Sequence, residues 1–132
     1  MMLKFFRIYG LSCVVALLIF YLSTTTSTSG YDGPRFEGMD KVVHFVLYFL
    51  LASVICRDFF RQSTPFASWK MVVWAIVLPI IYGGIIEILQ ENFFPPRTAE
   101  WGDWLADITG VLAGYFFSRI VFPKIYKVTN LT

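Results

Sequence analysis

The sequence predicts an all-α fold, a bundle of four transmembrane helices, and three observations support this prediction. The chain of 132 residues is 57% hydrophobic and only 15% charged, whereas a soluble domain is about 45–50% apolar and about 25% charged. Short polar segments separate four apolar stretches, each of roughly the length that crosses a bilayer. Basic residues are unevenly distributed between those segments. We therefore expect one integral membrane domain over residues 1–132.

The apolar stretches place the four spans. We expect helices at residues 5–22, 40–60, 70–90 and 104–122. About 20 helical residues are needed to cross the hydrocarbon core, so the second span is long enough only if Asp40 to Phe60 is one helix. Pro123 is expected to end the fourth span, because proline has no N–H to donate. Lys4 and Arg7 precede the apolar run of the first span, as basic residues do in a signal peptide. No A-x-A-like cleavage site follows the run, so we expect a retained anchor.

The distribution of charge predicts the orientation of the chain. With the N-terminus in the cytoplasm, eight of the 11 Lys and Arg residues lie on the cytoplasmic side, and only Arg35, Lys41 and Arg97 lie on the other. Positive charge near span ends is retained in the cytoplasm. Of the nine acidic residues, only Asp58 falls on the cytoplasmic side. We therefore expect an N-in/C-in protein with two outer loops.

The last three spans each contain one stripe of polar or small residues near the outer end. His44, Glu87 and Asp107 each lie four residues from an acidic residue nearer the outer end of the span. At 1.5 Å per residue, each is therefore about 6 Å deeper in the membrane than that acidic residue. An ionisable group at mid-bilayer costs about 2.5 kcal/mol or more, so these stripes should face one another and form a polar cleft. The stripe residues are Asp40, His44 and Tyr48; Gly83, Glu87 and Gln90; and Asp103, Asp107, Gly110 and Gly114. Gly110 and Gly114 would allow close helix packing.

Two kinds of chemistry fit this layer of residues. Acidic groups with an imidazole can hold a divalent cation, and the candidate ligands are Asp40, His44, Glu87, Asp103 and Asp107. Alternatively, a carboxylate and His44 can act as acid and base, which makes His44, Glu87 and Asp107 the catalytic candidates. Lys41 and Arg97 suit an anionic headgroup at the rim. The sequence selects no particular cofactor, and we expect no nucleic-acid partner.

Simpler interpretations of the same residues stay open. Asp40 and Asp103 each precede an apolar run and could be helix N-caps. His44 could be a hydrogen-bonded core histidine, and Glu87 could be paired structurally with Arg97. The two glycines could serve helix packing alone.

The order and spacing of these polar residues resemble a known family. The motifs are Asp40-Lys41-x-x-His44-Phe45-x-x-Tyr48-Phe49, Glu87-x-x-Gln90, Arg97, and Asp103-x-x-x-Asp107-x-x-Gly110-x-x-x-Gly114. This pattern is similar to that of the VanZ-like family of small bacterial membrane proteins. The family usually has Asn where this chain has Asp107, and often Pro-Gly where this chain has Pro95-Pro96. The resemblance implies a multi-pass protein of the bacterial inner membrane. The family's founding member is linked to resistance to the antibiotic teicoplanin, but the resemblance alone does not assign antibiotic resistance to this chain.

The sequence is compatible with three functions. The leading one is binding of an anionic envelope lipid or lipid-linked cell-wall precursor in the outer cleft. The second is a metal-dependent or acid–base hydrolase or transferase acting on a lipid phosphate, so whether the protein is an enzyme stays open. The third is a transport or structural subunit, as a homo-oligomer or within an envelope complex.

Overall fold

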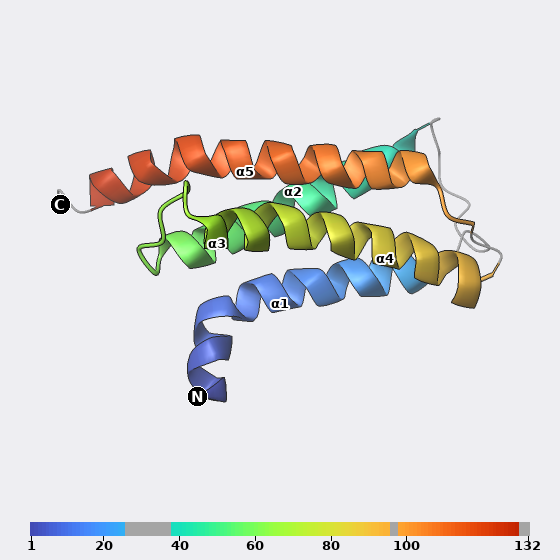
Figure 1. Cartoon of the computed structure of the whole chain (residues 1–132), viewed down its shortest axis with the longest axis horizontal. Coiled ribbons are helices and arrows are strands. Elements are labelled where there is room, and N and C mark those ends of the chain that lie inside the picture. Colours follow the sequence, from blue (N-terminus) through green and yellow to red (C-terminus); the bar gives the residue numbers. More distant parts are fainter. Residues whose placement is uncertain (26–37, 96–97, 130–132) are drawn as a thin grey trace.

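The computed structural model describes residues 1–25, 38–95 and 98–129. Within these ranges every regular element is a helix: α1 Met2–Thr25, α2 Met39–Phe60, α3 Trp69–Val72, the π-helical η1 Val73–Val77, α4 Leu78–Phe93 and α5 Trp101–Thr129. The elements α3, η1 and α4 form one continuous helix, so the described part of the chain has four helices long and apolar enough to cross a membrane (Figure 1). The predicted all-α fold with four spans is confirmed.

The prediction that Pro123 ends the fourth helix is wrong. Helix α5 continues through Pro123 to Thr129 rather than ending at the proline. The physical reason is that proline removes one backbone N–H and displaces one carbonyl, which bends an established helix more readily than it ends it. Helix α1 also extends beyond the predicted residues 5–22, and the Thr25 hydroxyl donates to the Tyr21 carbonyl at 2.6 Å in its last turn.

Helices α2 and α5 begin one and three residues before the starts predicted at residues 40 and 104, and the N-cap interpretation of two aspartates is wrong. Gly38 caps α2 with a φ of 85°, a left-handed conformation that glycine adopts without strain. In α5 the backbone N–H groups of Asp103 and Trp104 both donate to the Glu100 carbonyl, which places Glu100 at the N-cap. Asp40 and Asp103 therefore lie inside the first turns, where negative charge interacts favourably with the helix dipole.

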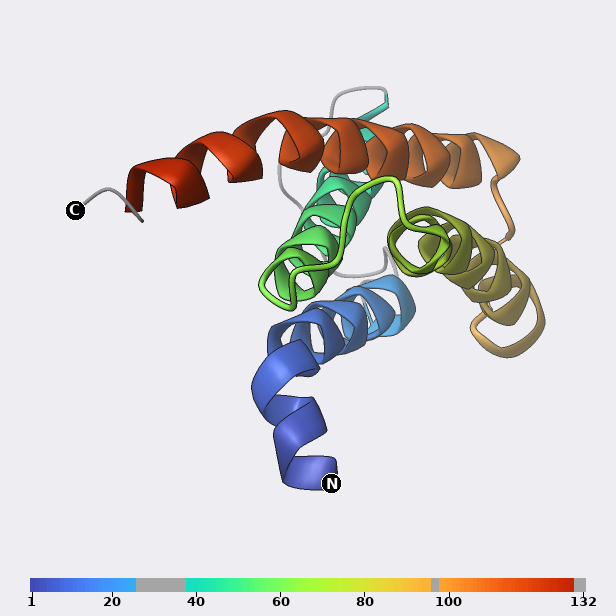
Figure 2. The same ribbon diagram turned by 60° about the vertical axis from the view of Figure 1, so that its left-hand side comes forward.

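The helices pack as a bundle in which α2 is central. Helix α5 packs along α2 and also contacts α4, whereas α1 packs against α2 and α4. The turned view shows α1 and α5 on opposite sides of α2 (Figure 2). The start of α1 and the end of α5 lie at one end of the bundle, here called the terminal end; the starts of α2 and α5 lie at the other, here called the loop end (Figure 1).

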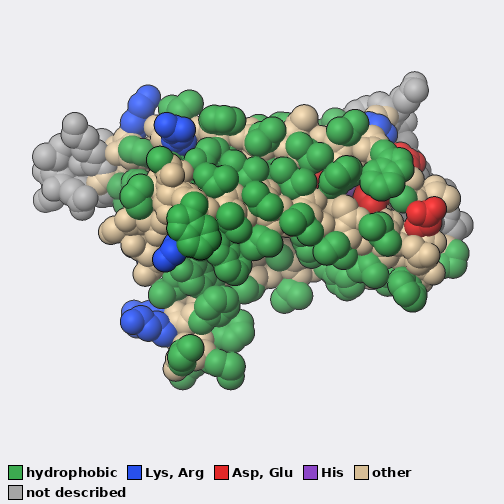
Figure 3. Space-filling view, viewed as in Figure 1, with side chains coloured by type: hydrophobic (Ala, Val, Ile, Leu, Met, Phe, Trp, Pro, Cys, Tyr) green, Lys and Arg blue, Asp and Glu red, His purple; other side chains and the backbone are tan. Residues whose placement is uncertain are grey.

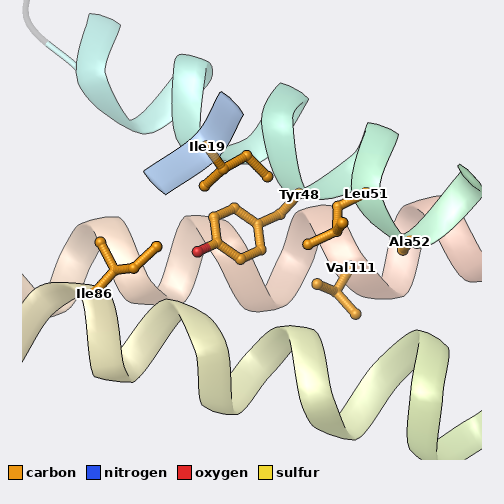
Figure 4. Close-up of a cluster of buried hydrophobic side chains, with 6 residues drawn as sticks. All are labelled: Ile19, Tyr48, Leu51, Ala52, Ile86 and Val111. Carbon is orange, nitrogen blue, oxygen red and sulfur yellow. The ribbon is translucent and has the colours of Figure 1, made fainter. Parts of the chain in front are cut away.

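Two groups of buried apolar side chains form the core. The first lies in the middle of the bundle and comprises Ile19, Tyr48, Leu51, Ala52, Ile86 and Val111 (Figure 4). The second comprises Cys56, Phe59, Phe66, Met71, Ala75 and Tyr115. Many other large apolar side chains are exposed around the bundle, as expected for a surface that faces acyl chains.

Charged side chains are segregated between the two ends. On the face shown in Figure 3, acidic side chains gather at the loop end, and most of the basic ones lie at the terminal end. The start of α1 and the end of α5 lie at the same end, which an even number of spans requires (Figure 1). The protein is therefore a multi-pass membrane protein by its architecture, and the cytoplasmic location of its termini stays a prediction.

Two glycines set the distance between α2 and α5. A Cβ on Gly110 would collide with the Phe45 carbonyl oxygen, and a Cβ on Gly114 would collide with the Phe49 carbonyl oxygen. Without side chains at these positions the two backbones approach closely. This contact fixes the position of α5 relative to α2 at the depth where their polar stripes lie.

Candidate functional site

The structure brings His44, Glu87 and Asp107 together at the loop end. They come from α2, α4 and α5, and all three are buried. One ligand atom from each, a ring nitrogen or a carboxylate oxygen, lies within 4.8 Å of the other two. We call these three residues the acid–histidine cluster. Three positions that are far apart in the chain, at the same predicted depth, thus form one site.

The imidazole of His44 lies between two aspartates of α5. Its Nδ1 is 2.9 Å from Asp107 Oδ1, and its Nε2 is 3.7 Å from Asp103 Oδ2. With Asp107 ionised, the ring proton belongs on Nδ1, which then donates to the carboxylate. Asp103 and Asp107 are one helical turn apart, so α5 presents both carboxylates to the same ring.

A row of charged groups leads from the surface into the cluster. Lys41 Nζ is 3.4 Å from both Asp103 Oδ1 and Glu100 Oε2. The exposed fraction of the side chain is 48% for Lys41, 9% and 11% for Asp103 and His44, and 1% for Asp107. Burial therefore increases from Lys41 at the surface to Asp107 in the core.

Glycine at position 83 makes room for Asp107. A Cβ built on Gly83 would lie 2.6 Å from Asp107 Oδ2, too close for any real contact. The neighbouring Trp104 ring packs over Gly84, and its Nε1 donates to the Ile80 carbonyl at 2.9 Å. Small residues on α4 thus allow α5 to bring its buried carboxylate close to the α4 backbone.

Two buried polar atoms, one in the acid–histidine cluster and one beside it, have no hydrogen-bond partner among the described residues. Glu87 Oε2 accepts the backbone N–H of Glu100 at 3.0 Å, but Glu87 Oε1 and the Tyr48 hydroxyl are both unsatisfied. Figure 4 shows the Tyr48 hydroxyl directed toward the loop end. An unsatisfied buried polar group costs about 1–3 kcal/mol, so these atoms indicate a place for a ligand.

Other residues predicted for the site take different positions. Asp40 is exposed and forms no hydrogen bond or ion pair with the described members of the site. Gln90 is buried, and its Nε2 donates to the Ser23 carbonyl at 2.7 Å, which ties α4 to α1. Arg97 lies outside the described residues, as does its alternative pairing with Glu87.

Glu100 is a site residue that lies outside the predicted polar stripes. Its backbone N–H binds Glu87 and its carboxylate contacts Lys41, so it connects α2, α4 and the start of α5. The available signal was its position three residues before Asp103, where the chain enters α5. Every residue except proline has a backbone N–H, so the pattern of polar side chains in the sequence does not indicate which N–H binds Glu87.

A second polar contact lies at the terminal end. Asp58 is buried, accepts the Ser12 hydroxyl at 2.7 Å and lies 3.4 Å from Arg57 Nη1. The mid-bundle apolar core, which includes Leu51 and Val111, separates this contact from the acid–histidine cluster. The two polar regions are therefore independent sites.

Comparison with known proteins assigns a family. No curated protein and no solved structure matches the chain. The VanZ/LLP1 family matches residues 3–122, which include the acid–histidine cluster and most of all four membrane helices. The match extends beyond the Asp40–Gly114 region in which the polar motifs lie. Because it covers nearly the whole chain, this protein belongs to the VanZ/LLP1 family, as the order of its polar residues predicted.

Proposed function

We propose that this protein binds the phosphate-bearing headgroup of an envelope lipid, or of a lipid-linked cell-wall precursor, at its loop end. In this proposal the loop end faces away from the cytoplasm of the bacterial inner membrane. The observation that supports it is the row of charged groups from exposed Lys41 to buried Asp107, at one end of a bundle with an apolar exterior. Such a surface suits an amphiphile with a charged head.

Lys41 is the first cation that a headgroup meets. Its ammonium contacts two carboxylates at 3.4 Å, longer than a strong charge-assisted hydrogen bond of about 2.7–2.9 Å. Glu100, one of those two partners, is itself exposed. A phosphate can therefore displace the Glu100 carboxylate from Lys41 at low cost, because an exposed ion pair contributes about 0–1 kcal/mol.

The apolar surface beside the cluster suits the acyl or prenyl chain of the same ligand. Val43, Ile88 and Leu105 lie on α2, α4 and α5 near the cluster residues in sequence, and all three are exposed. Trp101 is exposed at the start of α5, where an interfacial indole is favoured. A lipid can thus approach sideways from the membrane with its headgroup at the depth of Lys41.

Transport across the membrane is less well supported. A proton or ion path needs polar groups at successive depths. Between the cluster and Asp58 the described core is mainly apolar, and the hydroxyls of Ser53, Ser118 and Tyr115 each donate to a backbone carbonyl. The architecture favours binding or chemistry at one side of the membrane.

Hydrolysis or transfer on the bound lipid phosphate is the second candidate function. It is favoured by the 2.9 Å contact that orients the His44 ring through Asp107, as expected for a general base. His44 would take a proton from the attacking water or alcohol while Asp107 stabilises the imidazolium. In that case Asp107→Asn abolishes release of phosphate or of the transferred group and leaves lipid binding intact. Wild-type protein that turns over no lipid phosphate would exclude this candidate and leave the binding function standing.

Lipid binding is tested with the full chain in nanodiscs or detergent by native mass spectrometry. The probes are a polyprenyl phosphate and phosphatidylglycerol, and the variants are Lys41→Ala and His44→Ala. Lys70→Ala is the matched control, since Lys70 is an exposed lysine at the start of another membrane helix. We expect the wild type and Lys70→Ala to retain the probe and Lys41→Ala to lose most of it. Equal occupancy in all variants would refute the proposal.

A further inference from the structure

We propose that the acid–histidine cluster binds one divalent first-row metal ion, of the Zn²⁺ or Mn²⁺ type, through His44, Glu87 and Asp107. The inference stands on the geometry of these three residues and does not depend on the lipid ligand proposed above. The metal ion would provide a ligand bond or a hydrogen-bonded water for Glu87 Oε1 and the Tyr48 hydroxyl, which have no hydrogen-bond partner among the described residues.

The distances fit a common ion. For ligand bonds of about 2.1 Å, two ligands at a right angle are about 3.0 Å apart, and two on opposite sides are about 4.2 Å apart. The 2.9 Å between His44 Nδ1 and Asp107 Oδ1 therefore suits two ligands of one ion as well as it suits a shared proton. The 4.8 Å limit on all three ligand atoms exceeds the larger separation by about 0.6 Å, which side-chain rotation can remove.

The unsatisfied atoms are an independent observation. Glu87 is 1% exposed, and its Oε1 has no hydrogen-bond partner among the described residues although its Oε2 is bound. The Tyr48 hydroxyl is equally buried, unsatisfied and directed toward the loop end. A proton shared by His44 and Asp107 satisfies neither atom. A metal ion accepts Glu87 directly, and water bound to that ion can hydrogen-bond with the tyrosine.

The charge balance favours a divalent cation. With a neutral imidazole, the two buried carboxylates of the cluster carry two negative charges at a depth where desolvation is unfavourable. One M²⁺ ion neutralises both. Lys41 is positioned to compensate Glu100 and Asp103 and leaves the deeper pair without a nearby ammonium.

The donor atoms indicate the type of ion. One imidazole nitrogen with two carboxylates, and no thiolate, suits Zn²⁺ or Mn²⁺ better than Mg²⁺ or Ca²⁺, which prefer oxygen alone. With Nδ1 on the ion, the Nε2–H group lies 3.7 Å from Asp103 Oδ2, about 0.8 Å longer than the hydrogen bond by which an outer carboxylate orients a metal-bound histidine. Three protein ligands leave a coordination position for water or for a phosphate oxygen.

The test is metal binding by the purified full chain without added lipid. After chelator treatment, Zn²⁺ and Mn²⁺ are each titrated calorimetrically, and bound metal is counted by elemental analysis. We expect one equivalent of metal per chain in the wild type. Glu87→Gln and Asp107→Asn should each weaken binding by about 100-fold or more, because even the loss of an outer-shell partner typically costs about 10–100-fold.

Matched controls are available on the same helices. Glu91→Gln changes an exposed glutamate one turn from Glu87, and Asp40→Asn changes an exposed aspartate one turn from His44. Both should bind metal like the wild type. Absence of stoichiometric binding to the wild type, or equal binding by Glu87→Gln and Glu91→Gln, would overturn the proposal. A protein that binds metal but not polyprenyl phosphate would sink the lipid function alone.

Discussion

The Asp107 carboxylate lies directly against the backbone of Gly83, so that a single added carbon on Gly83 would come within 2.6 Å of Asp107 Oδ2. This contact relates α4 and α5 at the depth of the acid–histidine cluster. It makes a residue without a side chain part of the geometry that orients His44, because Asp107 is the nearest partner of the imidazole.

Gly83→Ala should disturb the cluster without changing any of its ligands. The new methyl group displaces the Asp107 carboxylate, and overpacking of this kind costs about 1–3 kcal/mol of stability. His44 is the one histidine in the sequence, so its imidazole ¹⁵N resonances report the change directly. Gly10→Ala is the control, because nothing lies within 4 Å of a Cβ at that position. Unchanged imidazole resonances in Gly83→Ala would contradict the observed contact.

His44 and Asp107 should be strongly coupled in stability. Removing one partner of a buried hydrogen bond leaves the other unsatisfied, which typically costs about 1–3 kcal/mol and more where the remaining group is charged. A double-mutant cycle with His44→Gln and Asp107→Asn should therefore give a coupling free energy of about 1–3 kcal/mol, measured by unfolding in detergent. Effects that add within about 0.5 kcal/mol would mean that the two residues do not interact.

The contact of α1 with α2 at the terminal end should depend on one hydroxyl. Ser12→Ala removes the 2.7 Å hydrogen bond to buried Asp58 and leaves a carboxylate oxygen short of a donor, at a cost of about 1–3 kcal/mol. Ser53→Ala is the comparison, since the Ser53 hydroxyl makes only a 3.5 Å contact with the Gly114 carbonyl. Thermal unfolding should separate the two variants, and equal midpoints would show that the Ser12 contact contributes no stability.

The orientation of the chain can be measured with reporter fusions. If the loop end faces away from the cytoplasm, alkaline phosphatase inserted between Phe93 and Trp101 should be active, and phosphatase fused at the C-terminus should be inactive. A fluorescent protein that folds only in the cytoplasm should give the opposite pattern. An inactive phosphatase between α4 and α5 would reverse the orientation on which the lipid proposal depends.

Depth was predictable from the sequence because the rise of a helix is constant. The positions of His44 and Asp107 four residues inside their spans were enough to expect them at one level. Rotation about the helix axis was less predictable. Gln90 follows Glu87 by three residues, which leaves its side chain about 60° away around the helix, and in the structure it faces α1. A helix with neighbours on two sides buries two adjacent faces, and the polar pattern alone does not separate them.

Backbone features were the other limit of prediction. The backbone N–H of Glu100 that binds Glu87, and the continuation of α5 through Pro123, depend on local chain geometry rather than on residue chemistry. The π-helical η1 shows the same limit. The Leu78 N–H donates to the Val73 carbonyl across five residues just before Pro79. Pro79 has no backbone N–H to donate, which favours a disturbance of the helix at this point, but whether the disturbance is a bend or a π-helical turn depends on the local backbone geometry.

The His44–Asp107 pair also constrains how the protein is made. The two residues are separated by 63 positions in the chain, so at about 5–20 residues per second the ribosome delivers Asp107 roughly 3–13 s after His44. During that interval α2 must remain at the translocon, or enter the bilayer, with its imidazole not yet joined to its partner. During insertion α2 is therefore made before its partner helix α5, and the contact between His44 and Asp107 can form only after α5 has been synthesised.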